Sequence, residues 1–225
     1  MDDSIRRRVA LATVTVVKDE EADSKGRGFL VPGGYVLTAA HCLPWSGEGE
    51  MPLGDHFLVT IIVADGSRLK GEVVAVEPVS DIAVIASPDG QTFPREANAF
   101  DEFVDSTEGL IVCKDEFPLG EAFPIGIFTH EEHWISGSAS QWRENAPTLF
   151  VETTPAVSGG TSGSAVLNDY GEVVGVVSTA SEPADEPEGR GTNTGTCARP
   201  CQSLPVWVWD AIKRAETDDE QLVQE

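Results

Sequence analysis

Gly159-Gly160-Thr161-Ser162-Gly163-Ser164-Ala165 is a run of small residues with a candidate nucleophile, Ser162, at its centre. A serine hydroxyl is a weak nucleophile unless a base takes its proton and the resulting oxyanion is stabilised. Small neighbours let a substrate carbonyl approach the backbone, and they permit a turn in which the amides of Gly160 and Ser162 point at one oxygen. Taken alone, the stretch also fits a Gly/Ser-rich surface turn.

A candidate base lies upstream. Residues 35–42 read YVLTAAHC, so His41 follows an apolar run and two alanines that permit close approach. A packed core histidine is the alternative, but the end of a predicted strand favours a functional role. His56, His130 and His133 have no such setting, and the HEEH stretch that ends at His133 indicates a solvated turn, with weak metal chelation as its alternative.

A candidate carboxylate precedes another apolar run. Asp81 stands directly before residues 82–85, which read IAVI. Burying a carboxylate is costly unless it is paired, and a histidine ring nitrogen is a suitable partner. An aspartate that merely ends a turn is the alternative.

Together, the three stretches resemble the trypsin/chymotrypsin superfamily over most of residues 9–212. They follow the family's order His, Asp, Ser, and the spacings of 40 residues from His41 to Asp81 and 81 residues from there to Ser162 have the size that the family shows. Among its members, the sequence is most similar to bacterial Deg/HtrA and glutamyl-endopeptidase proteins, through the GFLV, GYVLT and GEVVGVVS segments.

The resemblance implies a catalytic triad. Ser162 would attack the scissile carbonyl, His41 would accept and return its proton, and Asp81 would orient and stabilise the imidazolium. The amides of Gly160 and Ser162 would hold the oxyanion. Ser178 matches the family serine that lies against the catalytic aspartate, although an ordinary strand-end serine is the alternative.

The resemblance also implies a specificity pocket. Its base would lie near Ala156 and Val157, and its far wall would comprise Val177, Thr179 and Ala180. No acid stands at the base to attract Lys or Arg, and Val177 occupies the place of a histidine in glutamyl-specific relatives. We therefore expect cleavage of a protein or peptide substrate after small or medium apolar residues.

Two departures from the family pattern bear on regulation. Thr161 replaces the aspartate that pairs with a new amino terminus in members activated by chain cleavage, so that route is not expected. The usual partner of the cysteine after the catalytic histidine is missing, so Cys42 is expected to be free. Three kinds of switch for the activity are considered: an activating protein partner, an effector, or ordering of the acidic loop 181–196.

Short apolar runs and turn signals predict an all-β fold: two six-stranded antiparallel β-barrels of the chymotrypsin type, with a C-terminal α-helix. The expected organisation is a first barrel at 1–95 with the His and Asp, a linker at 96–108 without clear period, a second barrel at 109–203 with the Ser, and a helix and tail at 204–225. The predicted strands are 9–17, 28–31, 35–38, 57–63, 69–76 and 82–86, then 110–113, 122–127, 134–141, 149–153, 164–167 and 172–178.

The last predicted element is a helix. Ser203 is its expected N-cap, and Val206, Trp209 and Ile212 recur at helical spacing as its apolar face. Residues 216–225 are expected to be a frayed acidic tail.

The acidic composition argues against two kinds of binding. The formal charge is −23, from 38 acidic against 15 basic residues, which disfavours binding to nucleic acid and to anionic membrane surfaces. Cys197 and Cys201 could form a local disulfide, remain free thiols or supply half a metal site. They lack a second Cys/His pair with metal-site spacing, so neither metal nor cofactor is expected.

Targeting signals give a further expectation. Residues 1–17 lack the positive end, uninterrupted apolar core and cleavage site of a secretory signal. Taken as a natural start, they predict a cytoplasmic protein. No run approaches the roughly 18–20 apolar residues of a membrane span.

Three functional hypotheses remain. The first is an active serine endopeptidase. The second is a catalytically silent trypsin-fold scaffold or peptide-binding module, against which the intact candidate triad argues. The third is a viral-type protease that processes a polyprotein with the same barrels.

Overall fold

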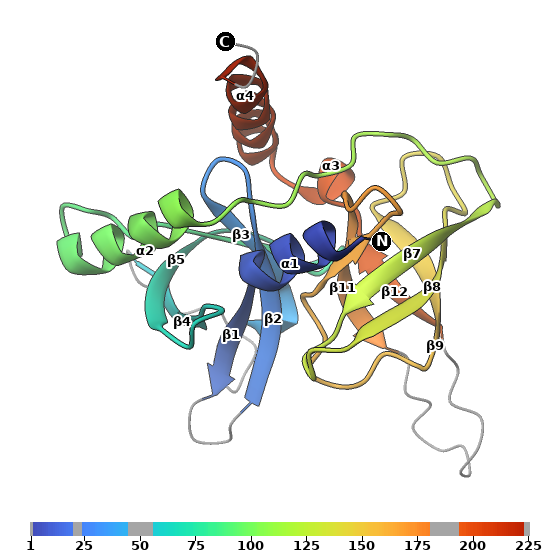
Figure 1. Cartoon of the computed structure of the whole chain (residues 1–225), viewed down its shortest axis with the longest axis horizontal. Helices are drawn as coiled ribbons and strands as arrows, with labels where there is room; N and C mark the ends of the chain where they lie inside the picture. Colours follow the sequence, from blue (N-terminus) through green and yellow to red (C-terminus); the bar gives the residue numbers. More distant parts are fainter. Residues whose placement is uncertain (1, 20–23, 45–55, 181–193, 223–225) are drawn as a thin grey trace.

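In the computed structural model, the strands form two closed antiparallel barrels that lie side by side (Figure 1). The structure describes residues 2–19, 24–44, 56–180 and 194–222. The strand order is β1-β2-β3-β6-β5-β4 in the first barrel and β10-β11-β12-β9-β8-β7 in the second. The predicted two-barrel all-β fold is therefore confirmed.

The first barrel brings the candidate base and carboxylate to one place. Its strands are β1 (Thr13–Asp19), β2 (Ser24–Val31), β3 (Tyr35–Ala39), β4 (Leu58–Ile62), β5 (Arg68–Glu77) and β6 (Ile82–Ala86). Strand β3 pairs with β6 so that Ala39 lies opposite Ile82. His41 follows the end of β3 and Asp81 precedes β6, so the antiparallel register alone makes these two residues neighbours.

The second barrel places two serines in the same way. Its strands are β7 (Ala122–Phe128), β8 (Trp134–Ser140), β9 (Thr148–Thr154), β10 (Ala165–Leu167), β11 (Val173–Ala180) and β12 (Thr194–Ala198). Ala165 of β10 pairs with Val176 of β11. Ser162 comes shortly before the first of these residues and Ser178 shortly after the second, so both serines lie at one end of the strand pair.

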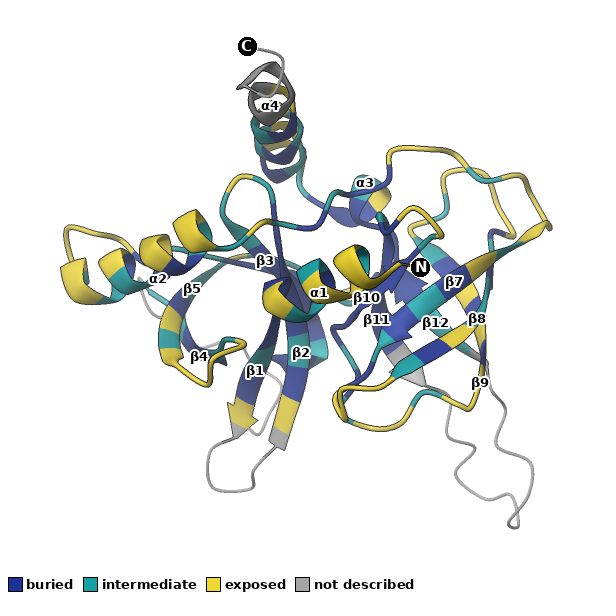
Figure 2. Ribbon diagram, viewed as in Figure 1, coloured by how far each residue is buried: buried dark blue, intermediate teal, exposed yellow. Residues whose placement is uncertain are grey.

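The core consists of two groups of buried side chains, one dominated by the first barrel and one confined to the second (Figure 2). Strands β3 and β6 are almost continuously buried, although strands of a barrel normally alternate between interior and exterior residues, so their outward faces are covered by neighbouring elements, which for β3 include β11. The candidate residues His41 and Asp81 lie at the ends of these two strands.

Helices α1 (Asp3–Ala12) and α2 (Pro94–Ser106) were not predicted. The predicted strand 9–17 is wrong over its first part, because helix α1 (Asp3–Ala12) occupies it and β1 begins at Thr13. The Asp2 carboxylate accepts hydrogen bonds from the amides of Ser4 and Ile5, which is N-cap chemistry. Figure 1 shows α1 lying across the junction of the two barrels.

The connection between the barrels is partly helical, although no regular period was expected there. Helix α2 (Pro94–Ser106) begins with proline at its first turn and buries Ala97, Phe100 and Phe103, which are spaced three residues apart. It packs against β5.

One strand of the second barrel was misplaced. Residues 110–113 are not a strand, and Val112 makes only an isolated bridge to Val173. The sixth strand is β12 (Thr194–Ala198), which pairs with both β9 and β11. The predicted loop 181–196 therefore ends in a strand, and its residues 181–193 lie outside the described part of the chain.

The C-terminal helix is confirmed, but its details differ. Ser203 belongs to the short helix α3 (Pro200–Ser203) and donates to the carbonyl of Pro147, so it does not cap α4 (Val206–Leu222). The buried face comprises Val208 and Ile212, whereas Val206 is 74% exposed.

The tail also departs from the expectation. Residue Glu216, predicted to begin a frayed segment, is buried within α4 and pairs with Lys114. Within the described ranges, no helix is both long enough and apolar enough to cross a membrane.

Candidate active site

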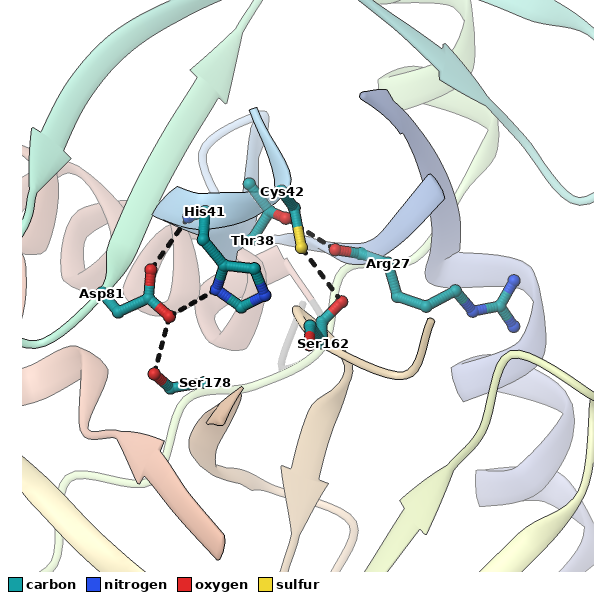
Figure 3. A network of polar contacts seen from close by, with 7 residues as sticks. All are labelled: Arg27, Thr38, His41, Cys42, Asp81, Ser162 and Ser178. Carbon is teal, nitrogen blue, oxygen red and sulfur yellow. Dashed lines mark hydrogen bonds and ion pairs between the residues drawn. The ribbon is translucent and has the colours of Figure 1, made fainter. Parts of the chain in front are cut away.

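Two hydrogen bonds join His41 to Asp81 (Figure 3). His41 lies in the short helix η1 (Ala40–Cys42), directly after β3. Its Nδ1 lies 2.7 Å from Asp81 Oδ2, and its backbone N–H donates to Asp81 Oδ1 at 2.9 Å. One carboxylate thus fixes both the ring and the backbone of the candidate base.

Asp81 is itself held in an uncommon conformation. Its φ is 60°, in the left-handed region that aspartate tolerates better than most residues. Its backbone carbonyl accepts from the amide of Ala40 at 3.1 Å, and its Oδ2 accepts from Ser178 Oγ at 2.6 Å. The bond from Ser178 crosses from the second barrel to the first, as the resemblance implied.

The pair is arranged to stabilise charge. Burial raises the pKa of Asp81, but hydrogen bonds from His41 and Ser178 outweigh it, so the pKa lies below its ordinary value. The pKa of His41 is raised, first by the hydrogen bond to Asp81 and then by Cys42, against an opposing effect of burial. The site therefore favours an ionised aspartate beside a histidine that readily accepts a proton.

The turn that carries Ser162 is bonded to strand β2. The Ser162 carbonyl accepts from the amide of Arg27 at 2.7 Å and from the Cys42 thiol at 3.4 Å. Gly163 has a φ of 87°, and a Cβ at this position would lie 1.9 Å from the Arg27 carbonyl oxygen. Only glycine fits here, so the small residues permit the close approach of the two barrels.

Ser162 lies on the other side of the imidazole from Asp81 (Figure 3). Among the bonds between described residues, none joins the Ser162 hydroxyl to His41, whereas the two bonds from His41 to Asp81 are formed. In proteases without substrate, catalytic hydrogen bonds are often long and tighten only in the complex.

The amides of Gly160 and Ser162 have no hydrogen-bond acceptor among the described residues. Gly160 has a φ of 87°. The amides of Thr161 and Gly163 donate to the carbonyls of Ser158 and Val177, at 3.3 and 2.7 Å. These are the two amides that the resemblance implies for the oxyanion.

The predicted pocket residues are only partly described. Val157 and Val177 pack with the core of the second barrel, and Ala156 is exposed. The amide of Val177 donates to the Ser164 carbonyl at 2.9 Å, which sets an apolar side chain close to the Ser162 turn. The side chains of Thr179 and Ala180 lie outside the described part, so the pocket stays a prediction.

All four cysteines are free. The prediction for Cys42 is confirmed, and Gly26 lies opposite it, where a Cβ would be 2.3 Å from its Sγ. Cys197 and Cys201 are not bridged, which excludes a local disulfide in this structure. Across the ranges that the structure describes, no three His, Cys, Asp or Glu side chains gather in a metal-binding group.

Three residues at the site were not predicted: Arg27, Thr38 and His130. Thr38 Oγ1 donates to the Arg27 carbonyl at 2.6 Å, which braces β2 beneath the Ser162 turn. His130, expected only in a solvated turn, lies with its Nδ1 3.2 Å from Thr161 Oγ1. Arg27 and Thr38 belong to the β2–β3 hairpin, whereas His130 follows β7 of the second barrel, so no spacing in the sequence indicates that all three meet at the Ser162 turn.

Residues 26–176 match the sequence model of the family described as "Trypsin-like peptidase domain". The chain belongs to this family. The match includes all three candidate triad residues and covers more than half of the chain.

Bacterial serine proteases are similar to this chain. It is 26% identical over 160 residues to a protein of Pseudomonas putida named "Probable periplasmic serine endoprotease DegP-like", covering 71% of this chain and 30% of that protein. It is 29% identical over 158 residues to a protein of the same name from Halomonas elongata, covering 70% and 30%. The chain thus spans about a third of the length of these relatives.

A solved structure supports the fold. The serine endoprotease of Yersinia pestis superposes with a TM-score of 0.61 at 18% identity, covering 95% of this chain and 67% of that one. The predicted resemblance to the trypsin-like superfamily, with relatives of the Deg/HtrA type, is therefore confirmed.

The prediction of a cytoplasmic location is wrong. The relatives from Pseudomonas and Halomonas are named as periplasmic, which points outside the cytoplasm. The prediction rested on residues 1–17 alone, and the beginning of the given sequence does not carry that information.

Proposed function

We propose that this protein is a serine endopeptidase that hydrolyses peptide bonds through an acyl-enzyme, with Ser162, His41 and Asp81 as its triad. The observation that supports it most is the bonding of Asp81, which accepts from His41 twice and from Ser178 once. An aspartate held in this way fixes the imidazole tautomer whose Nε2 can take a serine proton.

The proposed reaction follows from these contacts. Ser162 Oγ attacks the scissile carbonyl while His41 Nε2 accepts its proton, and the ionised Asp81 stabilises the imidazolium that forms. The amides of Gly160 and Ser162 donate to the new oxyanion. Return of the proton to the leaving amine gives the acyl-enzyme, and water then repeats the sequence of steps.

The substrate preference follows from the apolar side chains near Ser162. Val157 and Val177 offer no charge, so burying a Lys, Arg or Glu head against them would cost several kcal/mol, by order of magnitude. Burying a Val, Ala or Leu side chain gains roughly 1–3 kcal/mol. We therefore infer cleavage after small or medium aliphatic residues.

A fluorophosphonate probe tests the reaction. We expect labelling of the unaltered protein, loss of labelling in Ser162→Ala, and full labelling in Ser158→Ala, an exposed serine of the same segment. Ser162→Ala, His41→Ala and the double variant should lose peptide cleavage to nearly the same extent, because the residues act as one unit. Absent labelling would favour a silent scaffold, and labelling that persists in Ser162→Ala would exclude this nucleophile.

Cleavage profiling with a peptide library tests the preference. We expect Val, Ala and Leu before the cut, and a shift towards Arg and Lys in Ala156→Asp, which adds a carboxylate at the predicted pocket base. A profile dominated by Arg, Lys or Glu in the unaltered protein would contradict this pocket.

A further inference from the structure

His130 lies against the two residues that precede Ser162. Its Nδ1 is 3.2 Å from Thr161 Oγ1. A Cβ on Gly160 would lie 3.2 Å from the ring carbon Cγ of His130, so the imidazole packs closely on the glycine backbone. One side chain thus contacts both of the residues that lead into the nucleophile.

The turn that carries His130 is closed by hydrogen bonds between its own residues. It spans residues 129–133 between β7 and β8, and we call it the 129–133 turn. The amide of Thr129 donates to the His133 carbonyl at 2.8 Å, and the amide of Glu132 donates back to the Thr129 carbonyl at 3.0 Å. The amide of His133 also donates to Thr129 Oγ1 at 3.3 Å. These hydrogen bonds fix the backbone that carries His130.

Arg27 joins this turn to the nucleophile. Its Nη2 donates to the Thr129 carbonyl at 3.3 Å, while its backbone amide donates to the Ser162 carbonyl at 2.7 Å. Arg27 of strand β2 is therefore hydrogen-bonded to both the 129–133 turn and the Ser162 turn. Their relative position is fixed from the first barrel.

The contact with Thr161 is buried. Thr161 is 0% exposed, and its hydroxyl forms a hydrogen bond with His130. A buried hydroxyl that loses its partner costs free energy, so the bond ties the conformation of this residue to the position of the histidine. Moving Thr161 would also move the amides on either side of it.

We propose that His130 is a positioning residue that keeps the amides of Gly160 and Ser162 aimed at the oxyanion. It does so through its bond to Thr161 and its packing on Gly160. The role rests on the proposed function, because it concerns the stabilisation of a charge that forms only during acyl transfer. Stabilisation by fixed amides depends on their direction, so a small rotation of this turn lowers kcat.

Substitutions separate the bond from the packing. His130→Phe keeps a ring against Gly160 but removes the bond, and Thr161→Val removes the hydroxyl at nearly constant shape. Each should lower kcat about 10- to 100-fold with KM changed less than about twofold, since one lost oxyanion donor costs about 100- to 1,000-fold. The double variant should be scarcely worse than either single variant. His130→Asn, which puts a polar atom near the place of Nδ1, should restore much of the rate.

His133→Ala is the matched control. Its side chain belongs to the same turn, is 74% exposed and lies 3.7 Å from Glu131, away from the nucleophile. It should retain full kcat. Full kcat in both His130→Phe and Thr161→Val would overturn the proposal, as would equal losses in His133→Ala.

NMR relaxation of the backbone amides tests the role without turnover. The amides of Gly160 and Ser162 should become more mobile in His130→Phe and Thr161→Val than in the unaltered protein or His133→Ala. Unchanged order would overturn the positioning role, even if kcat fell. Fluorophosphonate labelling of the unaltered protein is the separate test of the proposed function, so a failure of one can be told from a failure of the other.

Discussion

At the scale of single residues, the charge on Asp81 controls the base. The hydrogen bond from His41 to this carboxylate is the largest reason that the pKa of the imidazole is raised. In the proposed mechanism only the neutral ring can take a proton from Ser162, so we expect kcat/KM to rise with pH. The midpoint of this rise should lie above the ordinary histidine value of about 6.5.

Asp81→Asn tests this control at constant side-chain volume. The amide removes the negative charge, so the midpoint should move down towards the ordinary histidine value, while kcat falls on the order of 10,000-fold. The pH dependence of kcat/KM, measured from about pH 5 to 10, checks both effects. An unchanged midpoint with reduced rate would show that Asp81 does not set the titration of His41.

Gly26 gives a prediction about stability. A Cβ there would lie 2.3 Å from Cys42 Sγ and 2.6 Å from its Cβ, so Gly26→Ala should lower the free energy of unfolding by about 1–3 kcal/mol. In a Cys42→Gly background the same change should cost much less, because the clash is gone. Urea unfolding of the four proteins measures the difference.

Gly90→Ala is the control for this change. The nearest atom to a Cβ on Gly90 is 3.8 Å away, which is ordinary contact, so the free energy of unfolding should change by less than about 0.5 kcal/mol. An equal loss in both glycine variants would point to a general backbone effect rather than to the contact with Cys42.

Short-range patterns predicted the parts of the site that depend on a strand end or a turn. His41 follows β3 and Asp81 precedes β6, so the strand register brings them together. Arg27 and His130 could not be found in this way. The contact of Arg27 with the Ser162 turn arises when the two barrels pack, and that of His130 arises when β7 pairs with β10 within the second barrel. The relevant distances depend on tertiary structure, which a local pattern does not encode.

At the scale of elements, helix α4 ties the end of the chain back to the first barrel. Val208 and Ile212 belong to the core group dominated by that barrel, and the ring of Trp207 lies edge-on to Tyr35 of β3. Figure 1 shows α4 rising above the β3 side of the molecule. The helix therefore contributes to the stability of the half that carries His41.

Two valines of α4 form a matched pair for testing this contribution. Val208 is fully buried and Val206 is 74% exposed. Val208→Ala should lower the free energy of unfolding by about 2 kcal/mol, because it removes two buried carbon groups and leaves a cavity. Val206→Ala should change it by less than about 0.5 kcal/mol. Denaturant titration measures both, and equal effects would contradict the docking of α4 through Val208.

The elements that were missed share a physical reason. In α2, three apolar residues spaced three apart supply a narrow helical face within an acidic stretch, and this face is easily overlooked. For α1, the sequence signal that indicates a helix start is the N-cap residue Asp2. Strand β12 follows a loop with many turn-forming residues, and its pairing with β9 and β11 comes from barrel closure rather than from its short TGTCA sequence.

At the scale of the whole molecule, charge should govern how substrates arrive. The formal charge of −23 creates a negative potential that attracts cationic chains. The pocket beside Ser162 is predicted to be apolar, so this attraction acts on substrate residues away from the cut. Positive residues there should speed association without changing the chemical step.

Two peptides with one cleavage site test this steering. One carries several Lys residues distant from the cut, and the other carries Glu at the same positions. At about 20 mM salt, kcat/KM should be at least about tenfold higher for the Lys peptide, and the ratio should approach one near about 0.5 M salt, where the screening length is only a few ångströms. The kcat values should agree throughout, because the reacting groups are the same. A large ratio that persists at high salt would indicate a specific contact, and a ratio near one at low salt would show that the net charge does not steer substrates.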